Sequence, residues 1–193
     1  MVFTGCGEKD PIPSQGKNPI ATIKLEDGGV IEVELYPDKA PNTVNNFISL
    51  AKSGYYDGKT FHRAMPGFMI QGGSPNGDGL STGFPYSIKA EFAVAGFTQN
   101  DISHTPGVIS MARLQSSYDS ASTQFFIMHG VADYLDGSYA AFGMVTTGMD
   151  VVDAIANSPC DGQFLIQQPV IKSITVETFG VNYPEPETIP VNG

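Results

Sequence analysis

The chain has 193 residues, of which 41% are hydrophobic, so it can bury the core of a single domain without help from disulfides or metals. Ten Lys and Arg residues against twenty Asp and Glu residues give a formal net charge of −10. This charge repels phosphate backbones and anionic lipid surfaces, so we expect no nucleic-acid partner. The sequence has no apolar run of about 18 to 20 residues, the length that spans a membrane.

Glycine and proline usage indicates the fold class. The 22 glycines and 14 prolines, with no tryptophan, favour many tight turns between short strands over a helical bundle. The composition therefore predicts an all-β or α+β protein.

The N-terminal sequence MVFTGCGEKD places Cys6 directly after Phe3, Thr4 and Gly5, which resembles the end of a bacterial lipoprotein signal whose apolar segment has been trimmed. We therefore predict that residues 1–19 are a flexible tether, lipidated at Cys6, that anchors the protein to the bacterial cell membrane outside the cytoplasm. The alternative is a disordered N-terminus with a chance cysteine in a cytoplasmic protein. A disulfide between Cys6 and Cys160 would only staple this tail, and we do not favour it.

The first structured elements are predicted to be a hairpin and a helix. Apolar residues alternate over residues 21–25 and 31–35 around the turn EDGG, which predicts an amphipathic β-hairpin with one solvated face. The period then changes, because Val44, Phe47, Ile48 and Ala51 follow helical spacing. Pro41 suits the start of this helix and Gly54 the position just past its end. We expect a helix of about three turns with one buried stripe.

The rest of the chain reads as short strands, one more helix and a tail. Residues 60–73 predict a strand that leads into a long Gly/Pro-rich surface loop. Strands are then predicted within 107–112, 124–129, 140–145 and 170–179, with a second helix within 146–159. We expect one domain over residues 20–180, and a Pro-rich acidic tail over 181–193 without regular structure.

Several kinds of chemistry have no motif in this sequence. The loop GGSPNGDG lacks the spacing of a dinucleotide or phosphate loop, so we interpret it as a flexible surface turn. His62, His104 and His129 lie in no metal-binding motif, and neither cysteine has a zinc or nucleophile spacing. No serine lies in a G-x-S-x-G elbow. We therefore expect no metal, no cofactor and no hydrolytic machinery.

What remains is a group of ordered motifs over residues 20–179: FHRAMPGFMIQGG, SMAR, TQFFI and YLDGSYAAFGMV. Together they resemble the cyclophilin family of peptidyl-prolyl cis-trans isomerases. The resemblance implies a mainly β fold, a closed eight-stranded antiparallel β-barrel capped by two α-helices. It also implies an isomerase that accelerates rotation about Xaa-Pro bonds in unfolded or flexible protein segments and so assists folding.

The resemblance carries the family's active site onto twelve positions. The implied catalytic residues are Arg63, His62 and Gln71, and the implied substrate-binding residues are Phe68, Met69, Ala112, Arg113, Gln124, Phe126, Tyr134, Leu135 and Tyr139.

Three of these positions depart from the commonest pattern of the family. Arg113 follows Ala112 where many relatives have asparagine, but the family uses the backbone at this position, so arginine is compatible. Tyr134 replaces a tryptophan whose indole N–H is a donor to cyclosporin, which argues against tight binding of that drug. Tyr139 replaces a histidine and alters how the proline pocket closes.

Isomerisation explains why nucleophiles and general bases are missing, because no covalent bond is made or cleaved. At the twisted geometry the proline nitrogen regains its lone pair, and a fixed donor then binds it better than in either ground state. Arg63, with its rigid fork of N–H groups, is the donor that we predict, whereas His62 supports the site and Gln71 holds the arginine or the substrate carbonyl. We expect a monomer. The competing hypothesis is a catalytically weak cyclophilin-like module that binds clients or scaffolds a partner.

Overall fold

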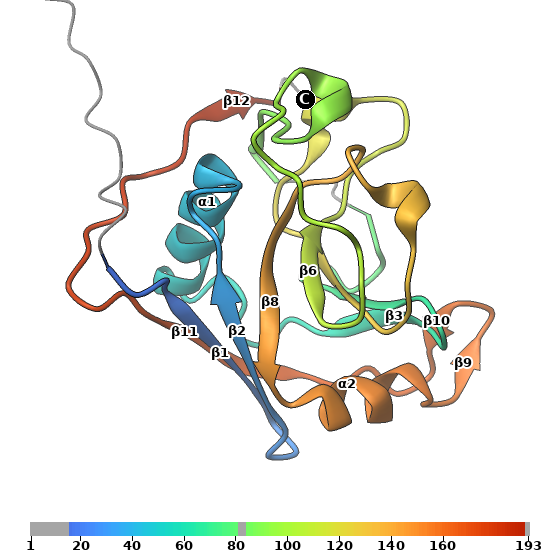
Figure 1. Ribbon diagram of the computed structural model, residues 1–193. Coiled ribbons are helices and arrows are strands. Elements are labelled where there is room, and N and C mark those ends of the chain that lie inside the picture. The colour runs from blue at the N-terminus through green and yellow to red at the C-terminus, as the bar shows by residue number, and fades with distance from the viewer. Residues whose placement is uncertain (1–15, 81–83, 192–193) are drawn as a thin grey trace, which may run out of the picture.

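The computed structural model describes residues 16–80 and 84–191 and shows a mainly β protein with two α-helices (Figure 1). Its main sheet is antiparallel throughout and contains ten strands. In pairing order the strands are β11 (Ile171–Glu177), β1 (Ile20–Leu25), β2 (Val30–Leu35), β8 (Ala141–Thr147), β6 (Val108–Met111), β7 (Phe125–Met128), β4 (Met69–Gly72), β3 (Phe61–Met65), β10 (Phe164–Leu165) and β9 (Cys160–Asp161).

The N-terminal hairpin forms as its alternation predicts. On β1, Ala21, Ile23 and Leu25 are buried, and β2 buries every second residue in the same way. In the register of the pair, Ala21 lies opposite Val33 and Ile23 lies opposite Ile31, so the two apolar rows share one face. This face packs into the core, and the charged side chains of both strands point the other way.

The first helix, α1 (Pro41–Lys52), has the predicted start, and Gly54 follows its end with the positive φ of 71° that glycine tolerates. Its N-terminus is capped by a distant side chain. The carboxylate of Glu91 accepts the backbone N–H of Asn42 at 2.9 Å and of Thr43 at 2.7 Å. A buried acid therefore satisfies N–H groups that a helix start leaves unpaired.

The second helix, α2 (Met149–Ala156), begins after Gly148, where the chain has a φ of 94°. A Cβ at this glycine would lie 2.2 Å from the carbonyl oxygen of Val30, so the turn requires glycine for both conformation and space. In Figure 1, α1 lies at the upper left and α2 runs below the sheet, so the two helices cover different ends of the fold.

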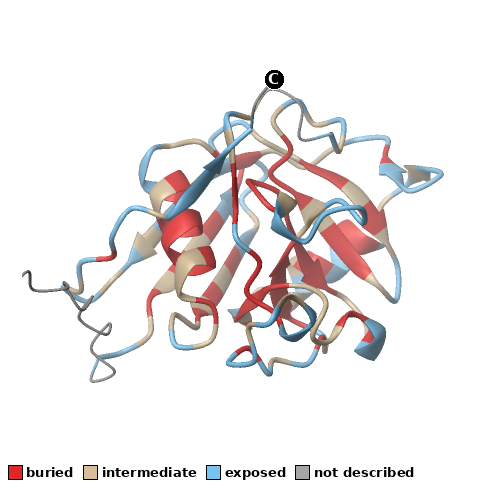
Figure 2. Ribbon diagram, turned by 90° about the horizontal axis from the view of Figure 1, so that it is seen from above, coloured by how far each residue is buried: buried red, intermediate tan, exposed pale blue. Residues whose placement is uncertain are grey.

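The core lies between the sheet and these helices, as the buried stretches in Figure 2 show. Its centre is aromatic: Phe47 of α1 packs against Tyr56, Phe125 and Phe142, with ring centroids 5.3 to 5.7 Å apart. Short 3-10 helices connect the strands at Ala93–Ala95, Tyr118–Ser120 and Asp133–Leu135.

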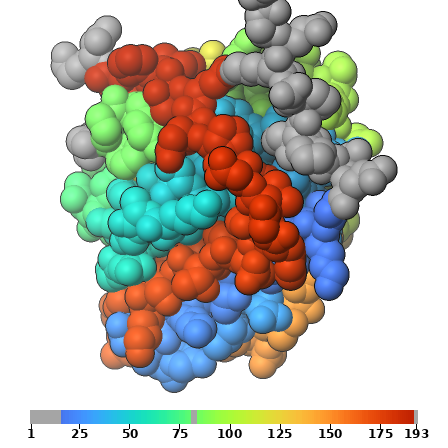
Figure 3. All heavy atoms as spheres, turned by 90° about the vertical axis from the view of Figure 1, so that its left-hand side faces the viewer, coloured from blue at the N-terminus to red at the C-terminus, as the bar shows by residue number. Residues whose placement is uncertain are grey.

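The C-terminal tail is ordered up to residue 191, and our prediction that it lacks regular structure is wrong. Residues 188–190 form β12 (Thr188–Pro190), which pairs with β5 (Tyr86–Ile88) in a second, two-stranded sheet. Upstream, the side chain of Asn42 exchanges two hydrogen bonds, of 2.9 and 2.7 Å, with the backbone of Glu187. Figure 3 shows the tail running across the molecular surface. Proline and acid content favours disorder, but these tertiary contacts override it.

The Gly/Pro-rich loop is also better ordered than a flexible turn over its described part, up to Leu80. The hydroxyl of Ser74 is buried and donates to Asp78 and to the backbone of Leu80, each at 3.1 Å. Lys59 donates to the carbonyl of Pro75 at 2.8 Å. A serine and a lysine therefore fold the loop back onto the sheet.

Two sequence-based expectations concern the cysteines and membranes. Cys6 lies outside the described residues, and Cys160 is a half-buried free thiol. No helix in the described part of the chain combines the length and the apolar content that crossing a membrane requires.

Candidate active site

A cavity of about 350 Å³ opens beside strands β3 and β4, and ten of the twelve predicted site residues line it. These ten are His62, Arg63, Phe68, Met69, Gln71, Ala112, Arg113, Phe126, Leu135 and Tyr139. Gln124 and Tyr134 lie near the cavity without lining it. The structure thus brings together residues that are almost eighty positions apart in the sequence.

Strand pairing explains why three of these side chains meet. In the β3–β4 hairpin, Arg63 lies opposite Gln71, and in the β4–β7 pair Gln71 lies opposite Phe126. Directly opposed residues of neighbouring antiparallel strands project to the same face of a sheet. Arg63, Gln71 and Phe126 therefore form one row across three strands.

The guanidinium of Arg63 is held by two amide oxygens. Its Nη1 donates to Oε1 of Gln71 at 3.0 Å, and its Nε donates to Oε1 of Gln163 at 2.8 Å. The remaining contact, Nη2 to the sulfur of Met65 at 3.4 Å, is a weak hydrogen bond. Partial burial lowers the pKa of Arg63 from its ordinary value, but a guanidinium stays protonated in proteins. The site therefore contains a fixed cation.

Gln71 and Gln124 continue this chain of hydrogen bonds into the protein. Nε2 of Gln71 donates to Oε1 of Gln124 at 2.9 Å, and Nε2 of Gln124 donates to the carbonyl of Gly79 at 3.0 Å. Because Gln71 donates through its nitrogen to Gln124, it presents its oxygen to Arg63. Gln124 is buried and lies behind Gln71. It therefore orients the amide of Gln71 and does not form the cavity wall.

His62 faces the cavity from the buried side of β3. Its side chain is fully buried, and neither ring nitrogen has a hydrogen-bond partner among the residues that the structure describes. Burial lowers the pKa of His62 to about 4, with the neighbouring Arg63 adding to the effect and Asp78 opposing it. The imidazole is therefore neutral at physiological pH and supports the site as an uncharged ring.

An apolar cluster forms the floor of the cavity. Met69, Phe126 and Leu135 are almost fully buried and belong to one cluster, with Phe68 and Tyr139 packed at its edge. The ring of Tyr139 meets that of Phe126 edge to face, with centroids 5.9 Å apart. A cationic donor and a hollow lined by apolar groups thus share one cavity.

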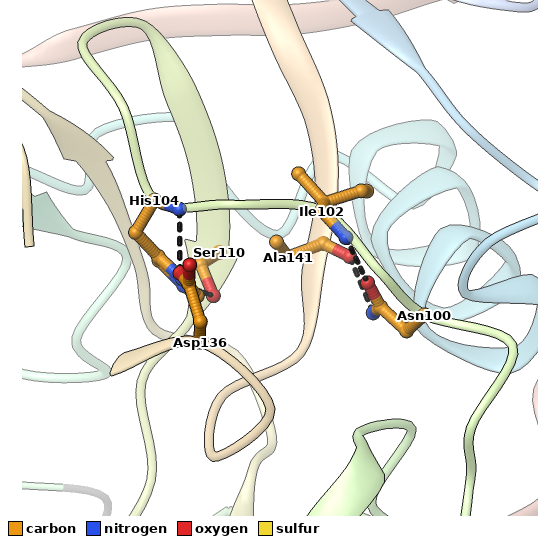
Figure 4. Close-up of polar contacts among 6 residues, drawn as sticks. All are labelled: Asn100, Ile102, His104, Ser110, Asp136 and Ala141. Atoms are coloured by element: carbon orange, nitrogen blue, oxygen red, sulfur yellow. Dashed lines mark hydrogen bonds and ion pairs between the residues drawn. The ribbon is translucent and has the colours of Figure 1, made fainter. Parts of the chain in front are cut away.

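Beneath this floor lies a buried polar network that sequence reasoning did not identify (Figure 4). The ring of His104 stacks on Phe126 with centroids 6.0 Å apart, and its Nδ1 and Nε2 lie 2.9 Å from Asp136 and 3.1 Å from the hydroxyl of Ser110. Burial lowers the pKa of His104, and Asp136 opposes this shift.

The hydrogen bonds from Ser110 to His104 and from His104 to Asp136 follow the pattern of a hydrolytic triad. Whether these residues could catalyse hydrolysis depends on whether a substrate can reach the hydroxyl of Ser110. Ser110 is 0% exposed and His104 is 1% exposed. A substrate carbonyl cannot reach the hydroxyl, so the network is structural and supports Phe126 from below.

Arg113 lies on the opposite wall and is bound differently from Arg63. Its Nε donates to the carbonyl of Ser138 at 3.0 Å, and its guanidinium carbon lies 4.6 to 5.4 Å from the ring centroids of Tyr139, Tyr118 and Phe92. The side chain therefore covers aromatic rings as a cation–π partner. In the described chain, the backbone N–H and C=O of Arg113 have no hydrogen-bond partner.

Tyr134 lies at the rim of the cavity. Its side chain is 72% exposed, and its ring centroid lies 6.1 Å from that of Phe68. The hydroxyl is thus presented to solvent beside the apolar floor.

Six residues at the site were not predicted from the sequence: the lining residues Asp78, Gly79, Leu80, Gln115 and Phe164, and the supporting residue Gln163. Phe164 lines the cavity next to His62, and Gln163 holds Arg63. Both belong to the short β9–β10 hairpin, which adds to the edge of β3. The Gly162–Gln163 pair, with glycine first, suits a two-residue hairpin turn and could have revealed it.

No group of three or more His, Cys, Asp or Glu side chains within residues 16–80 and 84–191 could hold a metal ion. The three histidines are separately placed: His129 accepts the backbone N–H of Gly67 at 2.7 Å and lies 3.0 Å from Asp153, away from His62 and His104. The cavity lining combines the amides of Gln71 and Gln115, the guanidinium groups of Arg63 and Arg113, the side chains of His62 and Asp78, and apolar groups.

Comparison with known proteins defines the class. The family model described as cyclophilin-type peptidyl-prolyl cis-trans isomerase matches residues 20–181. A crystal structure of a Cryptosporidium parvum cyclophilin-type peptidyl-prolyl cis-trans isomerase, in the presence of the dipeptide Ala-Pro, superimposes with a TM-score of 0.72 at 28% identity and covers 82% of this chain and 99% of that one. The fold is therefore a cyclophilin fold.

Sequence relatives agree with the structural comparison. Peptidyl-prolyl cis-trans isomerase B of Bacillus subtilis (strain 168) is 46% identical over 134 residues, which are 69% of this chain and 87% of that protein. A peptidyl-prolyl cis-trans isomerase of Acinetobacter baylyi is 41% identical over 166 residues, 80% of this chain and 82% of the relative. The chain belongs to the cyclophilin-type peptidyl-prolyl cis-trans isomerase family, as its motifs predicted, and is an isomerase.

Proposed function

We propose that this isomerase rotates Xaa-Pro bonds in unfolded or flexible protein segments, with the proline ring in the apolar hollow and the guanidinium of Arg63 aimed at the proline nitrogen. The observation that carries the proposal is the fixed position of that guanidinium between two amide oxygens at the edge of a cavity with an apolar floor. The Ala-Pro dipeptide in the related crystal structure supports a proline-containing peptide as the ligand.

Among the residues that the structure describes, Arg63 has N–H groups without a hydrogen-bond partner, and these can donate to the proline nitrogen. A guanidinium has five N–H groups, and three are engaged by Gln163, Gln71 and Met65 within the described chain. One N–H on each terminal nitrogen remains for the substrate. Twisting of the Xaa-Pro bond breaks amide resonance and returns the lone pair to nitrogen, so these donors bind the twisted state better than either planar state.

The apolar hollow and the opposite wall hold the substrate. Burying the three methylenes of a proline ring against Phe126, Met69 and Leu135 contributes about 2.4 kcal/mol, at roughly 0.8 kcal/mol per group. The unpaired backbone groups of Arg113 can pair with the substrate chain, which aligns the peptide next to the hollow. Binding is therefore weak and tolerant of sequence, as an enzyme for unfolded segments requires.

The magnitudes are consistent with one preorganised donor plus orientation. Raising a rate of about 10⁻² per second to roughly 10² or 10³ per second lowers the barrier by about 5.5 to 7 kcal/mol. A single fixed donor in a water-poor site supplies about 3 to 4 kcal/mol. The remainder comes from holding the chain and excluding water from the amide.

A protease-coupled assay with a proline tetrapeptide tests the proposal. We expect a rate well above the uncatalysed background, and loss of that rate in Arg63→Ala. The competing proposal, a weak client-binding or scaffold module, is left standing if no rate above background is found while circular dichroism shows the native fold. Because Arg63, its amide partners and the apolar floor are all in place, the structure favours the enzyme.

We also propose that the first eight strands of the main sheet, from β11 to β3, close into a barrel. Contacts between its two end strands support closure: Thr60, just before β3, bridges to Val170, just before β11, and the backbone N–H of Phe61 donates to the carbonyl of Pro169 at 3.0 Å. Closure leaves no free edge between β3 and β11. Hydrogen exchange tests this, because closure predicts slow exchange for the N–H of Phe61.

Finally, we propose that Cys6 is lipidated and holds the protein at the outer face of the bacterial cell membrane, as a monomer. The order FTGC supports this, because it matches the end of a lipoprotein signal. Mass spectrometry of the native protein is expected to find an acyl adduct on Cys6. A native protein with an unmodified Cys6 would favour the cytoplasmic alternative.

A further inference from the structure

The β9–β10 hairpin places a second amide against Arg63. Its two-residue turn is Gly162–Gln163, and the φ of 61° at Gly162 fits a type II′ turn, in which glycine takes the first position. Phe164 pairs with Arg63 across the β10–β3 ladder, and the N–H of Ala64 donates to the carbonyl of Gln163 at 3.0 Å. The backbone of the hairpin is thus fixed to the strand that carries Arg63.

Gln163 restrains a rotation that Gln71 alone leaves free. With only the Nη1 bond to Gln71, the plane of the guanidinium could turn about that contact. The second bond, from Nε to Oε1 of Gln163 at 2.8 Å, holds a different atom of the same plane. These two contacts and the covalent attachment of Nε to Cδ together fix the plane, so the free N–H groups have one direction.

We propose that Gln163 is a positioning residue, which orients the guanidinium of Arg63 toward the proline nitrogen. This inference rests on the proposed role of Arg63. Gln163 is exposed, and its amide accepts from Nε, so it acts through the arginine and does not form part of the apolar hollow. Placement of a donor by a few tenths of an ångström matters because the donor must meet the nitrogen only in the twisted state.

Three variants test this with two readouts. Gln163→Leu keeps the size of the side chain and removes the acceptor, Gln163→Glu keeps an acceptor, and Gln167→Leu is the matched control. Gln167 is exposed on the same connection, and its side chain has no hydrogen bond within the described residues. The readouts are kcat and KM in the isomerase assay, and the solvent-exchange rate of the Arg63 Nε–H by NMR. That resonance is assigned by its loss in Arg63→Lys.

For Gln163→Leu we expect kcat to fall about tenfold with KM within about twofold, and the Nε–H to exchange about tenfold faster. Gln163→Glu is expected to recover kcat to within about threefold of wild type and to keep the exchange slow. Gln167→Leu is expected to match wild type in both measurements.

The proposal is overturned if Gln163→Leu leaves the exchange rate unchanged, or if the Leu and Glu variants lose the same share of kcat, since the acceptor would then be irrelevant. Failure of the proposed function is a separate outcome, because it appears as an inactive wild-type enzyme. In that case the exchange rates of the Arg63 Nε–H still decide whether Gln163 positions the side chain.

Discussion

Two walls of the same cavity each contain an arginine, and they use it in opposite ways. On the β3–β4 wall, amide oxygens of Gln71 and Gln163 hold the guanidinium of Arg63 by its edge. On the other wall, the guanidinium of Arg113 lies over the rings of Tyr139, Tyr118 and Phe92. The first arrangement leaves one N–H on each terminal nitrogen without a partner in the described chain, whereas the second uses the flat face of the cation as packing surface.

The difference teaches that the partners of an arginine, more than its presence in a cavity, define its role. Neutral acceptors preserve the positive charge of Arg63 and fix its direction, as electrostatic preorganisation requires. The guanidinium of Arg113 lies against aromatic rings and donates to the carbonyls of Ser138 and Leu114, whereas its backbone groups have no hydrogen-bond partner in the described chain. The predictions below test this contrast.

The largest effect is expected for Arg63. Arg63→Ala should lower kcat by about a hundredfold or more without unfolding the protein, because it removes a donor that acts mainly in the transition state. The isomerase assay measures the rate, and circular dichroism checks the fold. Arg63→Lys is the control, since it keeps the charge without the rigid fork and should also lose activity. Near-normal turnover in Arg63→Ala would show that Arg63, like Arg113, is not needed for catalysis.

The next largest effect is the pH dependence of protein stability that His62, the neighbour of Arg63, causes. The pKa of His62 is about 4 in the folded protein against 6.5 as its ordinary value, so the unfolded chain binds the proton first as the pH falls. His62 therefore contributes its full stability above about pH 6.5, and this is lost progressively down to about pH 4. Between pH 7.5 and pH 5 we expect a loss of about 2 kcal/mol in the free energy of unfolding.

Denaturant titrations of the wild type and of His62→Phe at several pH values measure this loss. The variant has no titrating group at this position, so its stability should fall less over the same interval. The difference between the two proteins isolates His62 from His104, whose pKa burial also lowers. Parallel curves for both proteins would show that His62 is already exposed to protonation in the native state.

A smaller effect is expected for Tyr134, at the rim of the cavity. Tyr134→Trp should tighten cyclosporin binding by about three- to tenfold, the value of one neutral hydrogen bond from an indole N–H. Tyr134 is 72% exposed, so the larger ring fits without repacking the core. Titration calorimetry measures the affinity, with Tyr134→Phe as the control that lacks any donor. Equal affinities for all three proteins would contradict the missing-donor argument.

The smallest effect on turnover is expected for Arg113→Ala. We expect kcat to fall by no more than about threefold, because the backbone at this position remains. The free energy of unfolding should fall by about 1 kcal/mol through lost cation–π packing. The same assay and denaturant titration measure both values. A loss as large as that of Arg63→Ala would mean that both arginines act on the reacting bond.

Much of this fold could be predicted because local pattern and tertiary context agree. The hairpin of β1 and β2 alternates apolar and polar residues, and α1 has its proline start and buried stripe, so burial and period coincide. The tail did not follow its composition, because Asn42 and strand β5 hold it by contacts with residues about a hundred positions or more away. Such contacts leave no local signal.

The residues of the site also fall into a predicted group and a group that was missed. Motifs near the start of β3 and in β4 and β7 identified Arg63, Gln71 and Phe126, because strand pairing keeps them in one row. Gln163 and His104 were missed, because they reach the site from segments without a motif. Ser110 and Asp136 lie in the SMAR and YLDG motifs, but nothing in the sequence places them against His104. An exposed glutamine in a short hairpin looks like any surface residue until its partner is known.

The relay of Arg63, Gln71, Gln124 and the carbonyl of Gly79 contains no group that gains or loses a proton between about pH 5 and pH 11. The hydrogen bonds that orient Arg63 therefore keep the same charges throughout that range. When the acidity of the surroundings changes, the response of the protein lies in its folding stability, to which the titration of His62 contributes.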